Sequence, residues 1–142
     1  MTTTARTQRT HEILLAIPPK AEYLAFCRLV LAGIANARTL DAELLADLKL
    51  AVTEACSNAI RHAYVDSGEG EVEIRYELGE DQIVIEVADM GSGFELPPDE
   101  PEREALSEDG MGIAIIGALM DELELTPGPQ GRGSRFRFTK YL

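Results

Sequence analysis

The chain is poor in cysteine, in aromatic residues and in long apolar runs. Among its 142 residues there are two cysteines and no tryptophan, and aromatic residues make up 6%. No apolar stretch approaches the roughly 20 residues that a helix needs to cross a bilayer, which argues against a membrane partner. Cys27 and Cys56 each lie in a run with helical spacing, where a free cysteine usually behaves as a small buried hydrophobic residue. We therefore expect a reduced, cytoplasmic protein.

Positive charge is also scarce. Lys and Arg together number 13 against 25 Asp and Glu, so the formal net charge is -12. This balance argues against nucleic acid as a direct partner, because binding to phosphates depends on clustered lysine and arginine. A basic protein surface is the more natural partner. The length suits one domain, so we expect a disordered N-terminus at residues 1–10, without the apolar core of a signal peptide, and a single domain at 11–142.

Apolar spacing predicts an alternation of strands and helices along the chain. Strands are predicted at 11–17, 72–78, 83–87 and 134–141, and helices at 20–38, from 41 to the glycines at 68 and 70, and at 111–122. Residues 95–109 differ, since they hold seven acidic residues, one arginine and three prolines. That composition is typical of a mobile loop, which makes this segment a candidate acidic lid.

The order of these elements predicts the fold class. One strand, two helices, a hairpin, the acidic loop, a third helix and one or two final strands leave the helices able to cover only one face of a sheet. The predicted fold is therefore α+β, a two-layer α/β sandwich with a mixed, mostly antiparallel sheet and helices on one face. A long loop in such a fold can stand away from the helices and leave a pocket.

Four polar residues share one face of the second predicted helix. Their spacing of i, i+4, i+7 and i+8 lets all of them point into one cleft; they are Glu54, Asn58, Arg61 and His62. An asparagine oxygen suits Mg²⁺, which takes one or two protein oxygens and fills its shell with water and substrate phosphates. A carboxylate one turn earlier can orient or deprotonate an attacking hydroxyl or water. Taken alone, the pair also fits a solvated polar face.

A glycine-bearing turn follows the second strand of the hairpin. That strand leads into Asp89, and Gly91 and Gly93 come directly afterwards. Glycines let a flat ring approach the backbone, and an aspartate accepts a hydrogen bond from the exocyclic amine of adenine but repels the carbonyl oxygen of guanine. An isolated pattern of this kind also fits a tight turn.

Two further motifs lie near the C-terminus. The third predicted helix begins with Gly110, Met111 and Gly112, where free N–H groups and the helix dipole favour phosphate. Ser134 opens the final strand, and its small hydroxyl can support Asp89 directly or through water. Each is weak evidence alone, and an ordinary turn explains the serine equally well.

The combination and order of these motifs resemble the GHKL superfamily of ATPases over about residues 11–142. Within it, the chain is most similar to the small anti-sigma factor serine kinases of bacteria. The stretch from Glu54 to Tyr64 resembles their E-A-x-x-N-A-x-x-H-x-Y helix, and the stretch from Gly110 to Gly112 resembles their second glycine box.

The resemblance implies ATP and Mg²⁺ as cofactors, with Asn58 as the metal ligand, Glu54 as general base and Asp89 as the reader of adenine. The remaining residues of the expected nucleotide site are Arg61, His62, Gly91, Gly93, Gly110, Met111, Gly112 and Ser134. A sigma factor and an anti-sigma factor antagonist are the implied partners. A homodimer is implied as well, with the apolar first helix as its candidate surface.

One position departs from the family pattern. Members often carry an arginine two residues ahead of the second glycine box, where this chain has Glu108, and Arg103 is the only cation in the acidic loop. ATP binding survives such a loss better than phosphoryl transfer, which needs charge neutralised at the transferring group, although Arg61 or Arg103 could compensate. Two hypotheses therefore stay open: a serine kinase that also sequesters a sigma factor, and a regulatory module that binds ATP without transfer.

Overall fold

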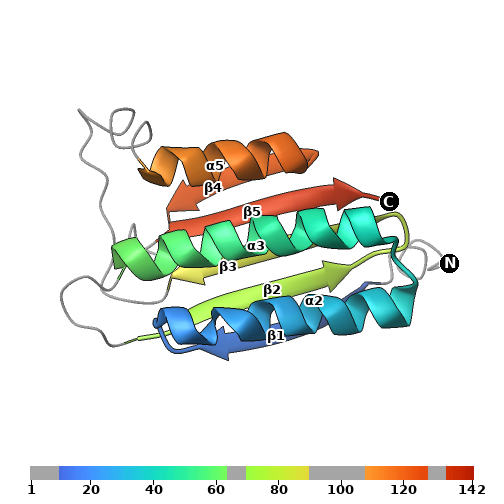
Figure 1. The fold of residues 1–142 in the computed structure, drawn as a ribbon, viewed down its shortest axis with the longest axis horizontal. Helices are drawn as coiled ribbons and strands as arrows, with labels where there is room; N and C mark the ends of the chain where they lie inside the picture. Colours follow the sequence, from blue (N-terminus) through green and yellow to red (C-terminus); the bar gives the residue numbers. More distant parts are fainter. Residues whose placement is uncertain (1–9, 64–69, 90–107, 128–133) are drawn as a thin grey trace, which may run out of the picture.

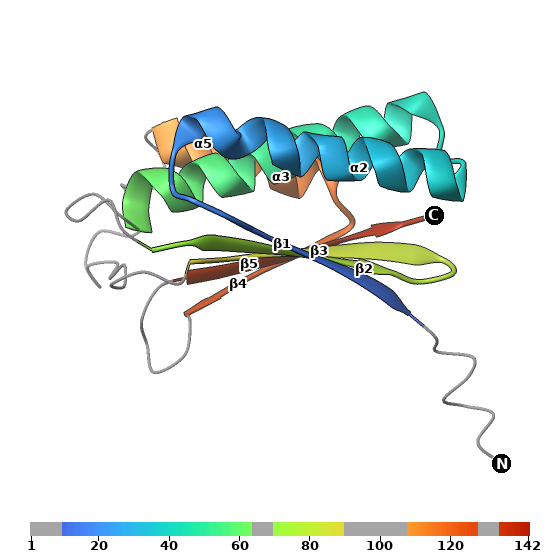
Figure 2. The same ribbon diagram turned by 90° about the horizontal axis from the view of Figure 1, so that it is seen from below.

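The computed structural model describes residues 10–63, 70–89, 108–127 and 134–142. Five strands form one sheet, and the helices lie together on one of its faces, which confirms the predicted α+β class (Figures 1 and 2). In chain order the elements are β1 (His11–Ile17), η1 (Ala21–Tyr23), α2 (Leu24–Arg38), α3 (Ala42–Ala63), β2 (Val72–Leu78), β3 (Gln82–Asp89), α5 (Glu108–Leu119), β4 (Glu122–Pro127) and β5 (Ser134–Tyr141).

The sheet has the strand order β1-β2-β3-β5-β4. All four pairings between neighbouring strands are antiparallel, so the described sheet has none of the parallel pairing that the expectation of a mixed sheet allowed. Alternation along β2 and β3 sets the register, because Ile74 lies opposite Val87 and Tyr76 opposite Ile85, all four with their side chains buried. This register places the apolar side chains of both strands on the face of the sheet that packs against the helices.

The core fills the space between this face and the helix layer. Its largest fully buried side chains include Tyr76 and Phe138 from the sheet and Leu31 and Leu48 from the helices. The Tyr76 hydroxyl donates a hydrogen bond to the carbonyl oxygen of Cys27 at 3.0 Å, which ties α2 to the middle of the sheet. Burial raises the pKa of Tyr76, so this hydroxyl stays a donor throughout the ordinary pH range.

The third long helix begins and ends earlier than predicted. α5 begins at Glu108 rather than near Met111, so the second glycine motif, which was predicted to begin the helix, lies within its first two turns. It ends at Leu119, whose carbonyl oxygen accepts a hydrogen bond from Lys140 Nζ at 3.0 Å. The residues after it form β4, the second of the one or two final strands that the sequence predicted. Within the described residues, no helix is both long and apolar enough to cross a membrane.

Candidate functional site

The elements that carry the predicted site residues meet at one end of the molecule. α3 and β3 both finish at the left of Figure 1, and α5 and β5 both begin there; Figure 2 shows the same from another side. α3 lies in the middle of the helix layer and packs against α2, α5 and β3. The fold therefore brings four separate stretches of sequence to one edge.

Asn58 lies in the enclosed part of this end. Its side chain is 7% exposed, and its Oδ1 atom has no hydrogen-bond partner among the described residues. A buried polar atom without a partner costs about 1–3 kcal/mol of folding free energy, so the fold tolerates this oxygen at a penalty. A neutral amide oxygen of this kind is a suitable ligand for a hard cation such as Mg²⁺, so Asn58 is compatible with the predicted metal site.

Glu54 lies one turn earlier on α3 and is half-buried against the start of α5. A Cβ atom built on Gly112 would lie 2.9 Å from Glu54 Oε1 and 3.9 Å from its Cβ and Cδ. A Cβ atom at this position would displace the end of the flexible Glu54 side chain, so the glycine lets the carboxylate lie against α5 in its present position. The structure thus brings the predicted general base directly onto the second glycine motif.

Asp89 is the last residue of β3 and lies opposite Val72 in the β2 register. Its side chain is 3% exposed, so its carboxylate sits in the interior, where a charge needs polar company. Gly91 and Gly93 lie outside the described residues. Recognition of the adenine amine by Asp89 therefore remains a prediction. It is based on the position of Asp89 at the end of a strand that packs against α3.

The other predicted residues are placed in less detail. The Arg61 side chain is exposed, and its Nη2 donates a hydrogen bond to the Ser57 hydroxyl at 3.4 Å, one turn earlier on α3. His62 belongs to α3, Gly110 and Met111 belong to α5, and Ser134 begins β5 opposite Pro127. The side chains of His62, Met111 and Ser134 lie outside what the structure describes, as does all of Arg103.

Alanine at Gly112 should disturb this site, whereas alanine at Gly117 should not. At Gly112 the new Cβ forces α5 or Glu54 to move, and we expect phosphoryl transfer to fall about tenfold, since small misplacements of reacting groups are costly. At Gly117 the nearest neighbour would be Leu123 Cδ2 at 3.9 Å, an ordinary contact. Gly117→Ala should raise the free energy of unfolding by about 0.5–1 kcal/mol, because alanine favours the helix.

Thermal denaturation and a phosphorylation assay on both variants test this contrast. The double variant Gly112→Ala/Glu54→Ala removes the colliding carboxylate and should be at least as stable as Gly112→Ala. An unchanged rate of transfer by Gly112→Ala would contradict the contact.

The chain is similar to known proteins over most of its length. Residues 17–139 match the family described as histidine kinase-like ATPase domain. The serine-protein kinase RsbW of Bacillus velezensis and that of Bacillus subtilis are each 37% identical over 139 residues, which cover 92% of this chain and 85% of theirs. The RsbW of Oceanobacillus iheyensis is 41% identical over 80% of this chain and 77% of its own.

A solved structure shows the same fold at low sequence identity. The chain matches the crystal structure of the SiaB-SiaC complex from Pseudomonas aeruginosa with a TM-score of 0.64 and 12% identity, over 98% of this chain and 94% of that one. At this identity the likeness concerns the fold alone. The arrangement of sheet and helix layer is therefore shared well beyond the sequences that resemble this one.

Proposed function

Because the chain belongs to the RsbW family of serine-protein kinases, with their histidine kinase-like ATPase domain, we propose that it transfers the γ-phosphate of ATP to a protein serine. The observation that carries the proposal is the buried Asn58 oxygen without a partner, one turn from a carboxylate that packs on the second glycine motif. A metal ligand, a base and a phosphate-binding helix start are the parts that this reaction needs.

Each residue has a distinct role in the proposed transfer. Bound at Asn58, Mg²⁺ would neutralise charge on the ATP phosphates. Glu54 takes the proton of the serine hydroxyl while the serine oxygen bonds to the γ-phosphorus and the bond to the β–γ bridging oxygen breaks, releasing ADP. Backbone N–H groups at the start of α5 hold the phosphates, and Asp89 accepts a hydrogen bond from the adenine amine.

A cation is still needed at the γ-phosphate, because the acidic Glu108 stands where relatives often have arginine. We assign this role to Arg61, whose charged side chain lies one turn beyond Asn58 on the same helix. The alternative is a regulatory module that binds ATP without transferring phosphate. An unreactive but tightly bound ATP would favour that alternative.

We propose as partners, in the cytoplasm, a sigma factor that the chain sequesters and an antagonist protein whose serine it phosphorylates. A net charge of -12 favours the approach of a basic surface, such as the DNA-facing side of a sigma factor. Phosphorylation of the antagonist would then leave the kinase free to hold the sigma factor.

The test measures phosphate transfer to an antagonist and co-purification of a sigma factor. The purified chain is incubated with γ-labelled ATP, Mg²⁺ and a candidate antagonist, beside an antagonist whose target serine is replaced by alanine. We expect label on the unaltered antagonist alone, and ATP-dependent co-purification of a sigma factor from the native extract. Tight ATP binding with no label on any antagonist would overturn the kinase and support the non-transferring module.

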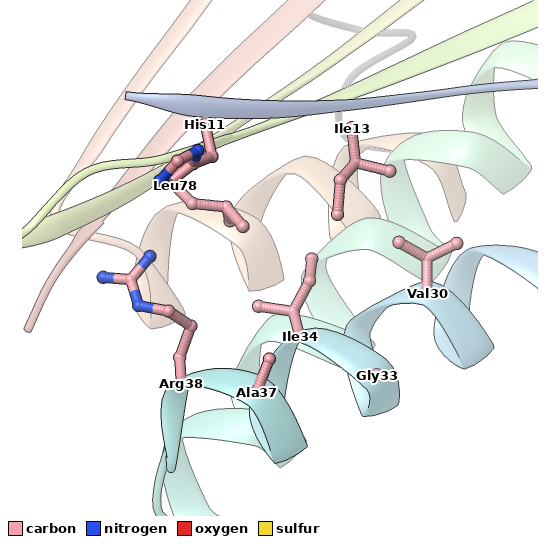
Figure 3. A pocket seen from close by; sticks show the side chains of 8 residues that line it. All are labelled: His11, Ile13, Val30, Gly33, Ile34, Ala37, Arg38 and Leu78. Carbon is pink, nitrogen blue, oxygen red and sulfur yellow. The ribbon is translucent and has the colours of Figure 1, made fainter. Parts of the chain in front are cut away.

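We also propose that the chain forms a homodimer through an apolar groove between α2 and β1. The groove encloses about 490 Å³ and is lined almost wholly by carbon (Figure 3); its residues are His11, Ile13, Val30, Gly33, Ile34, Ala37, Arg38 and Leu78. Two large apolar side chains of the same helix, Phe26 and Leu29, are 48% and 62% exposed. Contiguous apolar surface of this kind is typical of an interface.

Glutamate at Gly33 should separate the dimer into monomers. A side chain at this position starts in open space, since nothing lies within 4 Å of its Cβ, so the charge enters the groove without disturbing the subunit. The helix itself gains about 0.5 kcal/mol when glycine is replaced by a better helix former. Light scattering coupled to gel filtration should give a monomer mass for Gly33→Glu and a dimer mass for Gly33→Ala. A dimer in both would place the interface elsewhere.

A further inference from the structure

The two cysteines of the chain meet in the seam between α2 and α3. Cys27 Sγ and Cys56 Sγ are 3.6 Å apart, and both residues are 0% exposed. A disulfide bond is about 2.05 Å long, so the sulfurs need to approach by roughly 1.5 Å to form one. At the same seam, Arg28 Nη1 donates a hydrogen bond to Thr53 Oγ1 at 3.3 Å, which holds the helices side by side.

Cys56 occupies a sensitive position on α3. It lies two residues after Glu54 and two before Asn58, so the same turns of helix carry the thiol and the predicted site. α3 lies between α2 and α5 in the helix layer (Figure 1). Cys56 contacts α2, whereas Glu54 packs on Gly112 of α5. A pull on Cys56 toward α2 therefore draws Glu54 away from the second glycine motif.

The two thiols are unequal in reactivity. The hydrogen bond from Cys56 lowers the pKa of Cys27, and the positive charge of Arg28 acts in the same direction. Because the thiolate is the nucleophile, Cys27 is the thiol that attacks first and Cys56 is the one that resolves.

We propose that Cys27 and Cys56 form a redox switch, in which oxidation by a peroxide joins α2 to α3 through a disulfide and weakens nucleotide binding at the neighbouring site. Cys27 sulfur attacks one peroxide oxygen; the S–O bond forms, the O–O bond breaks, and hydroxide leaves and takes up a proton to become water. Cys56 sulfur then attacks Cys27 sulfur, the S–S bond forms, and the S–O oxygen leaves as a second water with the Cys56 proton. The two thiols lose two electrons, which reduce the peroxide to water.

Both sulfurs are buried, so peroxide reaches them when the seam opens locally. A small, uncharged oxidant suits this route better than a bulky disulfide reagent. The effect on binding rests on the proposed ATP site, whereas the chemistry of the thiols does not. The two parts of the proposal can therefore be measured separately.

Peroxide titration of the full-length protein tests the switch. Intact mass and peptide mapping should show the loss of two hydrogen atoms and one cross-link between the peptides of Cys27 and Cys56. The affinity for a fluorescent Mg-ATP analogue should fall about tenfold, within the usual range of coupling between sites, and should return on reduction. Cys27→Ala, or Cys27→Ser if alanine impairs folding, should keep its affinity under the same peroxide.

Two results would overturn the switch: gain of oxygen without a cross-link, or a complete cross-link with unchanged affinity. Failure of the reduced protein to bind the nucleotide would contradict the proposed function as well as the effect on binding. Mass analysis of the same oxidised sample would distinguish failure of the ATP site from failure of the disulfide, because the cross-link forms whether or not ATP binds.

Discussion

Replacement of Asn58 by alanine is expected to lower the affinity for Mg-ATP about 100-fold, in the upper part of the range reported for changes around a metal site. Asn58 Oδ1 is a buried oxygen without a hydrogen-bond partner in the described part of the chain, which leaves its lone pairs for the metal. The same change should leave the free energy of unfolding equal or higher, because alanine removes that orphaned oxygen and favours the helix. Titration calorimetry and thermal denaturation measure the two effects.

Removal of Mg²⁺ with a chelator shows whether Asn58→Ala weakens binding by removing a metal ligand or by changing the structure of the site. With EDTA present, the unaltered protein should bind ATP as weakly as Asn58→Ala, and the variant itself should change little. Glu43→Ala, an exposed change in the first turn of the same helix, is the control and should bind Mg-ATP normally. Magnesium-dependent binding of full strength by Asn58→Ala would refute the assignment of Asn58 as the ligand.

Replacement of Glu54 by glutamine is expected to slow phosphoryl transfer by about 10²–10⁴-fold, the usual contribution of a general base. Glutamine keeps the size and shape that pack against Gly112 but cannot take the proton of the serine hydroxyl. The dissociation constant for Mg-ATP should therefore stay unchanged, and the loss should appear in the rate of the chemical step. Single-turnover transfer of label to the antagonist measures that rate.

An exposed carboxylate on the same helix provides the control for Glu54. Glu43 lies in the first turn of α3, where its side chain is exposed, and Glu43→Gln should transfer phosphate at the normal rate. A normal rate for Glu54→Gln as well would show that another group accepts the proton. Equal losses in binding and in rate would instead indicate that Glu54 holds the nucleotide.

Most of the sheet was predictable because burial of one face imposes a period of two. The bounds of β1, β2 and β5 agree with the sequence pattern, and β3 is extended only to Gln82 and Asp89. β4 was harder to predict, since it is a short edge strand with only two large apolar residues, of which Leu125 is 45% exposed. The start of α5 was predicted about three residues late, because glycines at 110 and 112 disfavour a helix until α3 provides a surface for it to cover.

The sequence by itself determined the fold class, the family and the candidates for the residues of the site, since periodicity and motif order depend on neighbours along the chain. Only the tertiary structure decided that Gly112 abuts Glu54, that the Asn58 oxygen is enclosed without a partner, and that the two cysteine sulfurs lie 3.6 Å apart. Those contacts join different helices, and their distances follow from how α2, α3 and α5 pack side by side on the sheet. Periodicity specifies which face of each helix is buried, but the partner of each side chain depends on how far one helix is shifted along another.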